Sequence, residues 1–260
     1  DETLAFVLDS WPQALWWTKK EISARQPLAV AFPETEEHAA RLLSWAQSLS
    51  VAVVARGAGS GVLGAAIPSL AALVLDTSRL CSRFEISHDP QGPLVTVGSG
   101  MRGDALEARL NAEGYSLLHF PASLAVSTPG GWVATGSFGQ LSTRYGGINR
   151  QALALKAAYP GGDIHGDEPR VHLGAEGTLG LITEVTMRIR RLPKGWEGAG
   201  LNFRSLDEAL AFARALWRSS PEKPSVLRLY SPMDALLTGL RGGAGAGGSF
   251  TGLRRRLEAL

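Results

Sequence analysis

The feature that most constrains this chain is a glycine-dense stretch that directly follows a short apolar run. Residues 51–55 are typical of a buried strand, and the segment Arg56-Gly57-Ala58-Gly59-Ser60-Gly61 follows at once. Glycine permits positive φ and lets the backbone come close to a ligand. Successive N–H groups in such a turn can face one concavity and hold an anion, usually a phosphate. The alternative is a tight exit from the strand with no ligand.

Two well-known phosphate loops can be tested against this stretch. A Walker loop requires Lys-Ser or Lys-Thr after its last glycine, whereas two alanines follow Gly64. Residues 59–64 match the Rossmann dinucleotide pattern letter for letter, and Asp76 closes a second apparent strand. That pattern must open a crossover helix, but Pro68 interrupts the segment and few residues remain before Leu73. A phosphate-cradling loop of another kind is therefore favoured.

Composition excludes several classes of protein. The 260 residues carry 45% hydrophobic and 19% charged side chains and a formal net charge of +2, so nucleic acid is not an expected partner. Cys81 is the one cysteine, which excludes a disulfide framework, fits a reducing cytoplasmic compartment, and is expected to be buried. His165 and His172 lack metal-ligand spacing, so no metal site is expected. No signal peptide or membrane-spanning apolar run is expected either.

The order of elements along the chain predicts an α+β fold. Residues 28–33 form a strand, Thr35 caps a helix over 36–49, and residues 51–55 form the next strand, which together make a βαβ unit. The apolar face of that helix is expected to comprise Ala40, Leu42, Leu43, Trp45, Ala46 and Leu49. A hairpin over residues 84–97 and a helix over 103–113 follow. Before the first strand, an N-terminal helix is expected to pack Trp11, Trp16 and Trp17.

Two further stretches have unusual composition. Residues 121–139 contain many small and hydroxyl-bearing residues and no charge, which suits buried backbone lying against a flat polar ring system. Residues 174–185 hold a second glycine-rich loop that leads into an alternating strand. Glu176 lies in that loop, where it either pairs with a local base or faces a ligand.

Taken in order, these three stretches carry a family resemblance. Arg-Gly-Ala-Gly-Ser-Gly, then Pro-Ala-Ser-Leu with Ser-Thr-Pro-Gly-Gly-Trp-Val-Ala-Thr, then Gly-Ala-Glu-Gly-Thr-Leu-Gly resemble the vanillyl-alcohol-oxidase type of FAD-binding domain. Residues 130–135 and 142–146 are most similar to bacterial relatives of alkyl-dihydroxyacetone-phosphate synthase among the FAD-linked oxidases. The flavoprotein component of glycolate oxidase and the flavin D-lactate dehydrogenases are more distant. The resemblance covers residues 28–233, and each motif alone is weak.

The resemblance implies a set of residues that bind FAD. They are Arg56, Gly57, Ala58, Gly59, Ser60, Gly61, Ala122, Ser123, Ser127, Thr128, Thr135, Gly136, Ser137, Phe138, Glu176, Gly177, Gly180 and Ile182. Some relatives attach the flavin covalently through a histidine in the first loop, where this chain has Ser60, so FAD is expected to be non-covalent. Ala122 stands where the synthases often have Asp, and the segment between Gly162 and Gly174 is shorter than in relatives.

The resemblance also implies the domain organisation. It places an N-terminal helical segment at 1–26, and a two-subdomain FAD-binding domain at 27–193, with a small βαβ subdomain and a mixed sheet with helices. Part of a ferredoxin-like cap follows at 194–260, in which residues 201–230 are expected to form strand, helix and strand. In synthase-like relatives an arginine of the second cap strand contacts substrate, and Arg228 occupies that position. The tyrosine and histidines that catalyse in relatives lie further on, so the catalytic residues are unknown.

The leading function implied is an FAD-dependent oxidoreductase that transfers a hydride from a small hydroxy acid or alcohol to flavin N5. One alternative is synthase-type chemistry with no net redox change. Another is a cofactor-binding subunit or fragment without its own catalytic base. The expected partners are a small anionic substrate and either a second copy or another protein chain. A full C-terminal sequence would discriminate among these functions.

Overall fold

The structure is a computed structural model that describes residues 5–237. The chain divides into two compact units, Asp1–Leu192 and Pro193–Leu260, which are described separately. Unit 1 contains a small parallel sheet and a larger antiparallel sheet, and the predicted α+β fold is confirmed. Among the described residues, no helix is both long and apolar enough to cross a membrane.

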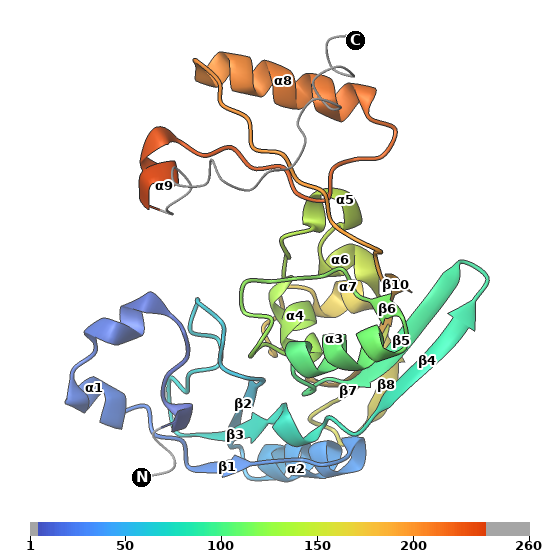
Figure 1. The fold of residues 1–260 in the computed structure, drawn as a ribbon. Coiled ribbons are helices and arrows are strands. Elements are labelled where there is room, and N and C mark those ends of the chain that lie inside the picture. The colour runs from blue at the N-terminus through green and yellow to red at the C-terminus, as the bar shows by residue number, and fades with distance from the viewer. Residues whose placement is uncertain (1–4, 238–260) are drawn as a thin grey trace. The chain divides into compact units, whose positions relative to one another are not determined.

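The small sheet has three parallel strands in the order β1-β3-β2 (Figure 1). The strands are β1 (Ala29–Ala31), β2 (Ala52–Arg56) and β3 (Ala72–Asp76). Helix α2 (Glu36–Ser48) connects β1 to β2, as the βαβ pattern predicts, but β3 lies between these two strands. Every residue of β3 is buried, which is typical of a central parallel strand. The strand β2 therefore lies at the edge of this sheet, and the glycine-rich segment 57–61 follows its carboxyl end.

Helix α2 begins where the sequence predicts and packs through small side chains. The Thr35 hydroxyl accepts a hydrogen bond from the His38 N–H at 3.2 Å, which caps the helix. Its buried residues are Ala39, Ala40, Leu43 and Ala46. The expected apolar face is wrong at Trp45 and Leu49, which are 52% and 56% exposed. The buried alanines allow α2 to approach the sheet closely, whereas Trp45 and Leu49 point to solvent.

The larger sheet has five strands in the order β4-β5-β9-β7-β8, and each neighbouring pair is antiparallel. The strands are β4 (Phe84–Asp89), β5 (Gly92–Gly98), β7 (Ala152–Ala158), β8 (Ile164–Asp167) and β9 (Leu181–Arg188). The predicted hairpin is the β4–β5 pair, and it is confirmed. A separate two-stranded pair joins β6 (Tyr115–Ser116) to β10 (Arg190–Arg191).

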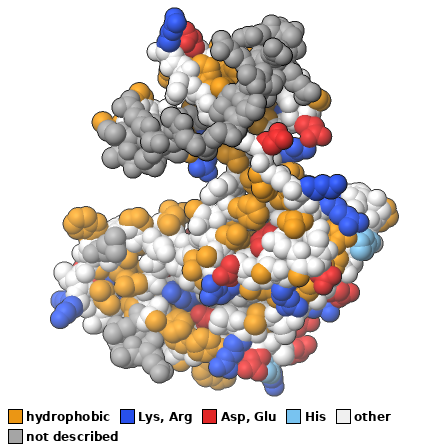
Figure 2. Space-filling view, in the orientation of Figure 1, with side chains coloured by type: hydrophobic (Ala, Val, Ile, Leu, Met, Phe, Trp, Pro, Cys, Tyr) orange, Lys and Arg blue, Asp and Glu red, His pale blue; other side chains and the backbone are white. Residues whose placement is uncertain are grey.

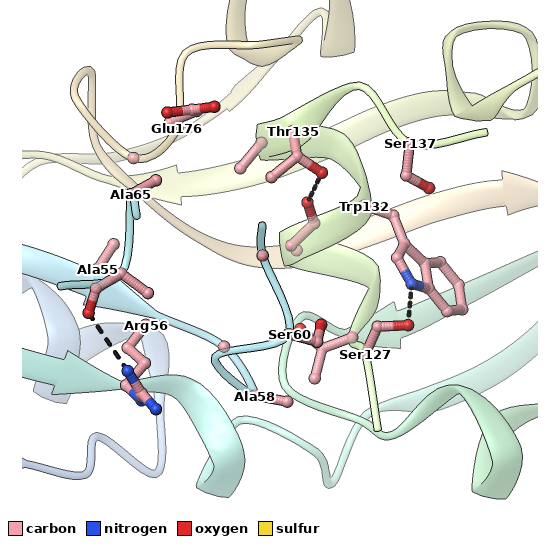
Figure 3. A pocket seen from close by; sticks show the side chains of 18 of the residues that line it. Ala55, Arg56, Ala58, Ser60, Ala65, Ser127, Trp132, Thr135, Ser137 and Glu176 are labelled. Carbon is pink, nitrogen blue, oxygen red and sulfur yellow. Dashed lines mark hydrogen bonds between the residues drawn. The ribbon is translucent and has the colours of Figure 1, made fainter. Parts of the chain in front are cut away.

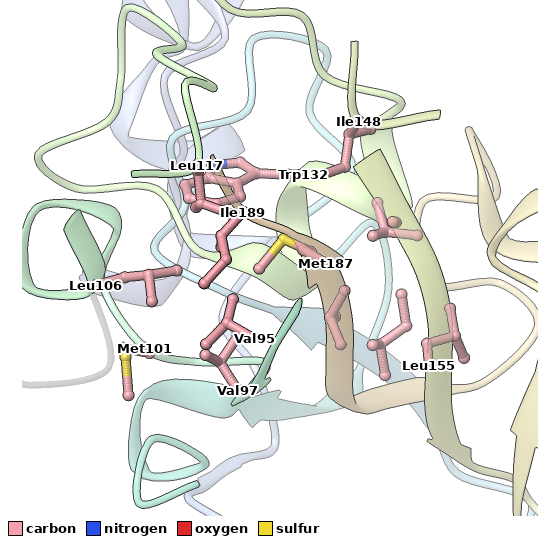
Figure 4. Packing of buried hydrophobic residues seen from close by; sticks show 14 of the residues in the cluster. Val95, Val97, Met101, Leu106, Leu117, Trp132, Ile148, Leu155, Met187 and Ile189 are labelled. Carbon is pink, nitrogen blue, oxygen red and sulfur yellow. The ribbon is translucent and has the colours of Figure 1, made fainter. Parts of the chain in front are cut away.

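The main core lies between this sheet and the helices that cover it. The helices of this region are α3 (Gly103–Ala112), α4 (Pro129–Thr135), α5 (Ser142–Tyr145), α6 (Ile148–Gln151) and α7 (Pro169–His172). Figure 4 shows Trp132 of α4 beside Leu117 and Ile189, close to Met187 of the central strand β9. Trp132 is 2% exposed, so its indole ring fixes helix α4 on the core.

Two local expectations in unit 1 are wrong. The N-terminal helix is replaced by two short helices, η2 (Pro12–Trp16) and α1 (Lys19–Ser23), because the chain is extended at Trp17 and at the capping residue Thr18. Trp16 is 85% exposed and does not serve as packing. Cys81 is exposed rather than buried, because it lies in the irregular segment between a 3₁₀ turn and β4.

Unit 2 contains two helices within its described residues, α8 (Leu206–Ser219) and α9 (Pro232–Leu237). The Ser205 hydroxyl caps α8 by accepting from the Glu208 N–H at 3.2 Å. The strands expected on either side of α8 do not form, and residues 226–230 are irregular. A strand requires a neighbour for its backbone hydrogen bonds, and residues 193–237 contain none. The expectation of a strand there is wrong for the described part of this unit.

Candidate cofactor-binding site

Three chain segments that are distant in sequence meet around one cavity of about 470 Å³ in unit 1 (Figure 3). Residues 55–66 follow β2, residues 121–138 include α4, and residues 176–182 lead into β9. Every residue predicted to bind the cofactor lines this cavity, with the exception of Gly136. Those that line it are Arg56, Gly57, Ala58, Gly59, Ser60, Gly61, Ala122, Ser123, Ser127, Thr128, Thr135, Ser137, Phe138, Glu176, Gly177, Gly180 and Ile182.

A buried arginine stabilises the glycine loop of the first segment, residues 57–61. Arg56 is 8% exposed, and its guanidinium donates to the carbonyls of Ala5, Leu8 and Ala66 at 3.1, 2.9 and 3.3 Å. Burial lowers the pKa of this guanidinium, and nearby aspartates act in the opposite direction. A ligand would therefore meet the backbone of this residue, while the side chain stabilises the loop.

The shape of this loop depends on glycine. Gly59 has φ +63°, and a Cβ there would lie 2.3 Å from Nη2 of Arg56. A Cβ on Gly57 would lie 2.6 Å from Oγ1 of Thr128, so the first two segments touch at that point. Among the described residues, no carbonyl or side chain accepts from the backbone N–H groups of 58–61. These groups are available to an acceptor in the cavity.

The second segment presents hydroxyl groups at the wall of the cavity. The Trp132 indole N–H donates to Oγ of Ser127 at 2.7 Å, which leaves the Ser127 hydroxyl hydrogen available as a donor (Figure 3). Oγ1 of Thr128 is buried and has no hydrogen-bond partner within the described residues. Because a buried hydroxyl without a partner is costly, this atom is suited to form a hydrogen bond with a ligand at the junction with Gly57.

The end of α4 turns the chain back toward the cavity. Gly136 ends the helix in the left-handed conformation at φ +66°, so it orients Ser137 and Phe138 without lining the cavity itself. Thr135 donates its hydroxyl to the Gly131 carbonyl at 2.8 Å. Phe138 is 67% exposed and offers an apolar surface beside these polar groups.

His119 supports this segment from the protein interior. It is 1% exposed, and its Nε2 lies 2.7 Å from Oγ of Ser137. Burial lowers the pKa of His119 from 6.5 to about 4. The folded protein therefore binds fewer protons than the unfolded chain between these pH values. The contribution of neutral His119 to the unfolding free energy is therefore fully present above pH 6.5, and it decreases as the pH falls toward 4.

We expect the neutral substitution His119→Gln to remove most of this pH dependence. The contribution of His119 to the decrease in unfolding free energy between pH 6.5 and 4 is about 3 kcal/mol at most. Urea unfolding of wild type and variant at several pH values measures it. Equal slopes for both proteins over this range would show that His119 titrates normally in the folded state.

The third segment closes the other side of the cavity. Glu176 has φ +50°, which is uncommon outside glycine, and its N–H donates to the Ala134 carbonyl at 2.9 Å. A Cβ on Gly177 would lie 2.8 Å from Cβ of Ala55, so this loop packs directly on β2. Figure 3 shows the Glu176 carboxylate at the cavity, far from Trp132 in the view. The position of Glu176 therefore favours the expectation that it faces the cofactor.

The resemblance placed cofactor segments over residues 55–61 and 176–182, so it also covered Ala55 and Leu181. It missed several other lining residues, which are Val62, Leu63, Ala65, Ala66, Thr77, Pro121, Gly130, Gly131, Trp132, Ala134 and His172. Trp132 lies inside the second motif, in helix α4, and its position in that motif was the available signal. His172 is held by Asp167 and Tyr159, with Nε2 at 3.0 and 3.1 Å from their oxygen atoms. The described residues contain no cluster of three metal-ligating side chains.

Comparison with known families decides which cofactor such a cavity serves. Residues 27–166 match the family described as FAD binding domain. The chain belongs to this family. Its FAD-binding domain thus includes the first two segments of the cavity, and FAD is the cofactor.

Individual relatives agree with this assignment. The chain is 30% identical over 225 residues to an alkyldihydroxyacetonephosphate synthase of Dictyostelium discoideum, covering 82% of this chain and 36% of that protein. It is 30% identical over 207 residues to a mitochondrial D-lactate dehydrogenase (cytochrome) of Arabidopsis thaliana, covering 74% and 35%. A solved alkyldihydroxyacetonephosphate synthase superposes with a TM-score of 0.57 at 30% identity, covering 64% and 32%. The chain thus spans about a third of the length of these relatives.

The residues of the FAD-binding domain fit the chemistry of FAD. The diphosphate of FAD is an anion that open N–H groups can bind, and residues 58–61 have them. The flavin ring, the ribityl chain and the ribose of FAD all form hydrogen bonds, and Thr128 offers a buried hydroxyl without a partner among the described residues. The cavity volume of about 470 Å³ lies within the usual range of roughly 300–1,000 Å³ for small-molecule and cofactor sites.

Proposed function

We propose that this chain is the FAD-binding part of an oxidoreductase that acts on a small hydroxy acid or alcohol. The observation that carries the proposal is the meeting of the three glycine- and hydroxyl-rich segments at one cavity. When bound, FAD supplies a hydride acceptor at its N5 atom. The chain's own residues hold and orient it: the loop 57–61 binds the diphosphate, and Ser127 and Thr128 donate from the second segment.

The mode of FAD attachment is part of the proposal. Ser60 occupies the loop position at which some relatives carry a histidine that bonds to flavin. Cys81 does not line the cavity, so it offers no thiol for attachment. Both facts support non-covalent binding of FAD. The cytoplasmic location and the pairing with a second copy or another protein chain stay predictions from the sequence.

The test of the proposed function is reduction of the bound flavin by substrate. The FAD-loaded protein is mixed with D-lactate without oxygen, and the visible flavin absorbance is followed. Loss of this band, restored by oxygen, supports hydride transfer. D-lactate is chosen because the Arabidopsis thaliana relative is a D-lactate dehydrogenase. If this chain binds FAD and neither D-lactate nor glycolate reduces it, hydride transfer by this chain alone is contradicted, and the alternative of a cofactor-binding part without its own catalytic base is favoured.

The synthase relatives favour a second candidate, a flavoenzyme reaction without net redox change. Dihydroxyacetone phosphate would then alter the flavin spectrum, and oxygen would not restore it in the way that it restores a reduced flavin. The same spectrometer experiment, run with this ketone phosphate in place of D-lactate, distinguishes the two candidates.

Arg228 stays our candidate for binding an anionic substrate. It is exposed, and its Nη1 lies 3.4 Å from Oη of Tyr230. A guanidinium binds a carboxylate or phosphate in bidentate geometry, which lysine does not reproduce. We expect Arg228→Lys to keep FAD binding and to weaken substrate binding by about 2 kcal/mol. Flavin-spectrum titrations with D-lactate, glycolate and dihydroxyacetone phosphate measure this effect.

The matched control is Arg218→Lys, which changes another exposed arginine of the same unit. It is expected to leave every anion affinity unchanged. If Arg228→Lys also leaves them unchanged, Arg228 is not the substrate-binding arginine.

A further inference from the structure

A segment far from the glycine loop in sequence covers its outer side. We define the strap as residues 5–11. Phe6 packs edge-on against Phe32 at the end of β1, with ring centroids 5.8 Å apart, and Val7 is fully buried. The strap is therefore docked on the small sheet by apolar contacts.

Arg56 connects the strap to the glycine loop through hydrogen bonds. One of its terminal nitrogens, Nη2, donates to two strap carbonyls, Ala5 at 3.1 Å and Leu8 at 2.9 Å. Its other terminal nitrogen donates to the Ala66 carbonyl at 3.3 Å, beyond the loop. The guanidinium also lies over the Phe6 ring, 5.4 Å from its centroid. One planar fork thus holds both the strap and the loop.

The strap also touches the loop directly, at its glycines. The Ser10 N–H donates to the Gly59 carbonyl at 3.1 Å. The Trp11 indole lies on Gly64, where a Cβ would be 2.7 Å from its Cε3 atom. The Asp9 carboxylate accepts from the Trp11 N–H at 2.8 Å, which fixes the turn between these two contacts. The strap therefore holds both ends of the loop segment 59–64.

We propose that the strap is a positioning element for cofactor binding, which fixes the conformation of the glycine loop that receives the diphosphate. The proposal rests on the proposed function, because it assigns the loop to FAD. A flexible, glycine-rich loop loses entropy when it is ordered around a ligand, and a docked strap removes part of that cost in advance. Coupling of this kind is reciprocal, so bound FAD must strengthen strap docking by the same factor.

The test compares two tryptophans of the same region. Trp11→Ala removes the contact with Gly64, whereas Trp16 is 85% exposed, and Trp16→Ala is the matched control. Figure 2 shows hydrophobic side chains on the surface of the region that contains α1, so a variant that loses only an exposed indole is a necessary control. We expect FAD to bind Trp11→Ala roughly 10-fold more weakly than wild type, and Trp16→Ala equally well.

Hydrogen exchange supplies the reciprocal readout. In wild type, added FAD is expected to slow amide exchange in the strap, including the Ser10 N–H, and this protection is expected to be smaller in Trp11→Ala. If circular dichroism shows that Trp11→Ala is unfolded, Arg56→Lys replaces it, because lysine cannot form the fork. The inference is overturned if the folded variant binds FAD with the same affinity as wild type. It is also overturned if FAD does not change the rate of amide exchange in the strap. Wild type that takes up no FAD overturns the proposed function itself.

Discussion

Replacing Gly59 with alanine is expected to reduce FAD binding by roughly 100-fold or more. The new Cβ would lie 2.3 Å from Nη2 of Arg56, and the residue already has φ +63°. The guanidinium cannot move aside easily, because it is buried and donates to three carbonyls. The loop must therefore change conformation, which displaces the N–H groups of 58–61. Fluorescence titration with FAD measures the loss.

The matched control for this variant is Gly114→Ala. Gly114 has φ +76°, so alanine meets a similar backbone cost of about 1 kcal/mol, but no atom lies within 4 Å of its Cβ position. Gly114 follows α3 and does not line the cavity. FAD affinity in Gly114→Ala should equal that of wild type. A Gly59→Ala protein with normal FAD affinity would place the diphosphate elsewhere.

The second large effect is expected for Trp132→Ala, which should lower the unfolding free energy by about 4 kcal/mol. Trp132 is 2% exposed and packs with residues from the central strands of the larger sheet. Its removal leaves a cavity and takes the N–H donor away from Ser127. Urea unfolding of wild type and variant measures the change.

Two other variants separate packing from hydrogen bonding. Trp132→Phe keeps most of the apolar contact and loses the bond to Ser127, so a loss of about 1 kcal/mol or slightly more is expected. Trp16→Ala removes an exposed indole and should change the unfolding free energy by less than about 0.5 kcal/mol. If Trp132→Ala were as mild as Trp16→Ala, the core around α4 would not be formed as described.

Much of this arrangement follows from local sequence signals. The Thr35 cap, the hairpin turn before Gly92 and the glycine that ends α3 are short-range features, and the structure has the elements that they predict. The three cavity segments could be recognised because each combines glycine with hydroxyl residues and little charge. Their order along the chain linked them to one family of FAD-binding domains.

The features that could not be predicted are long-range. Arg56 bonds to carbonyls 48 and 51 positions away, and nothing in the local sequence of either segment indicates that pairing. Strand β3 lies between β1 and β2, and the order of strands and helices along the sequence does not specify this position. The strand expected at 226–230 has a suitable alternating pattern, but a pattern alone provides no partner strand.

The central claim is that this chain binds FAD in the cavity between its three glycine- and hydroxyl-rich segments. The most direct test is titration of the purified, flavin-free protein with FAD, followed by its absorbance and fluorescence. We predict a yellow protein that binds one FAD per chain and releases it into the supernatant on acid precipitation. A colourless protein that takes up no FAD would contradict the account, and binding of NAD in its place would restore the Rossmann interpretation.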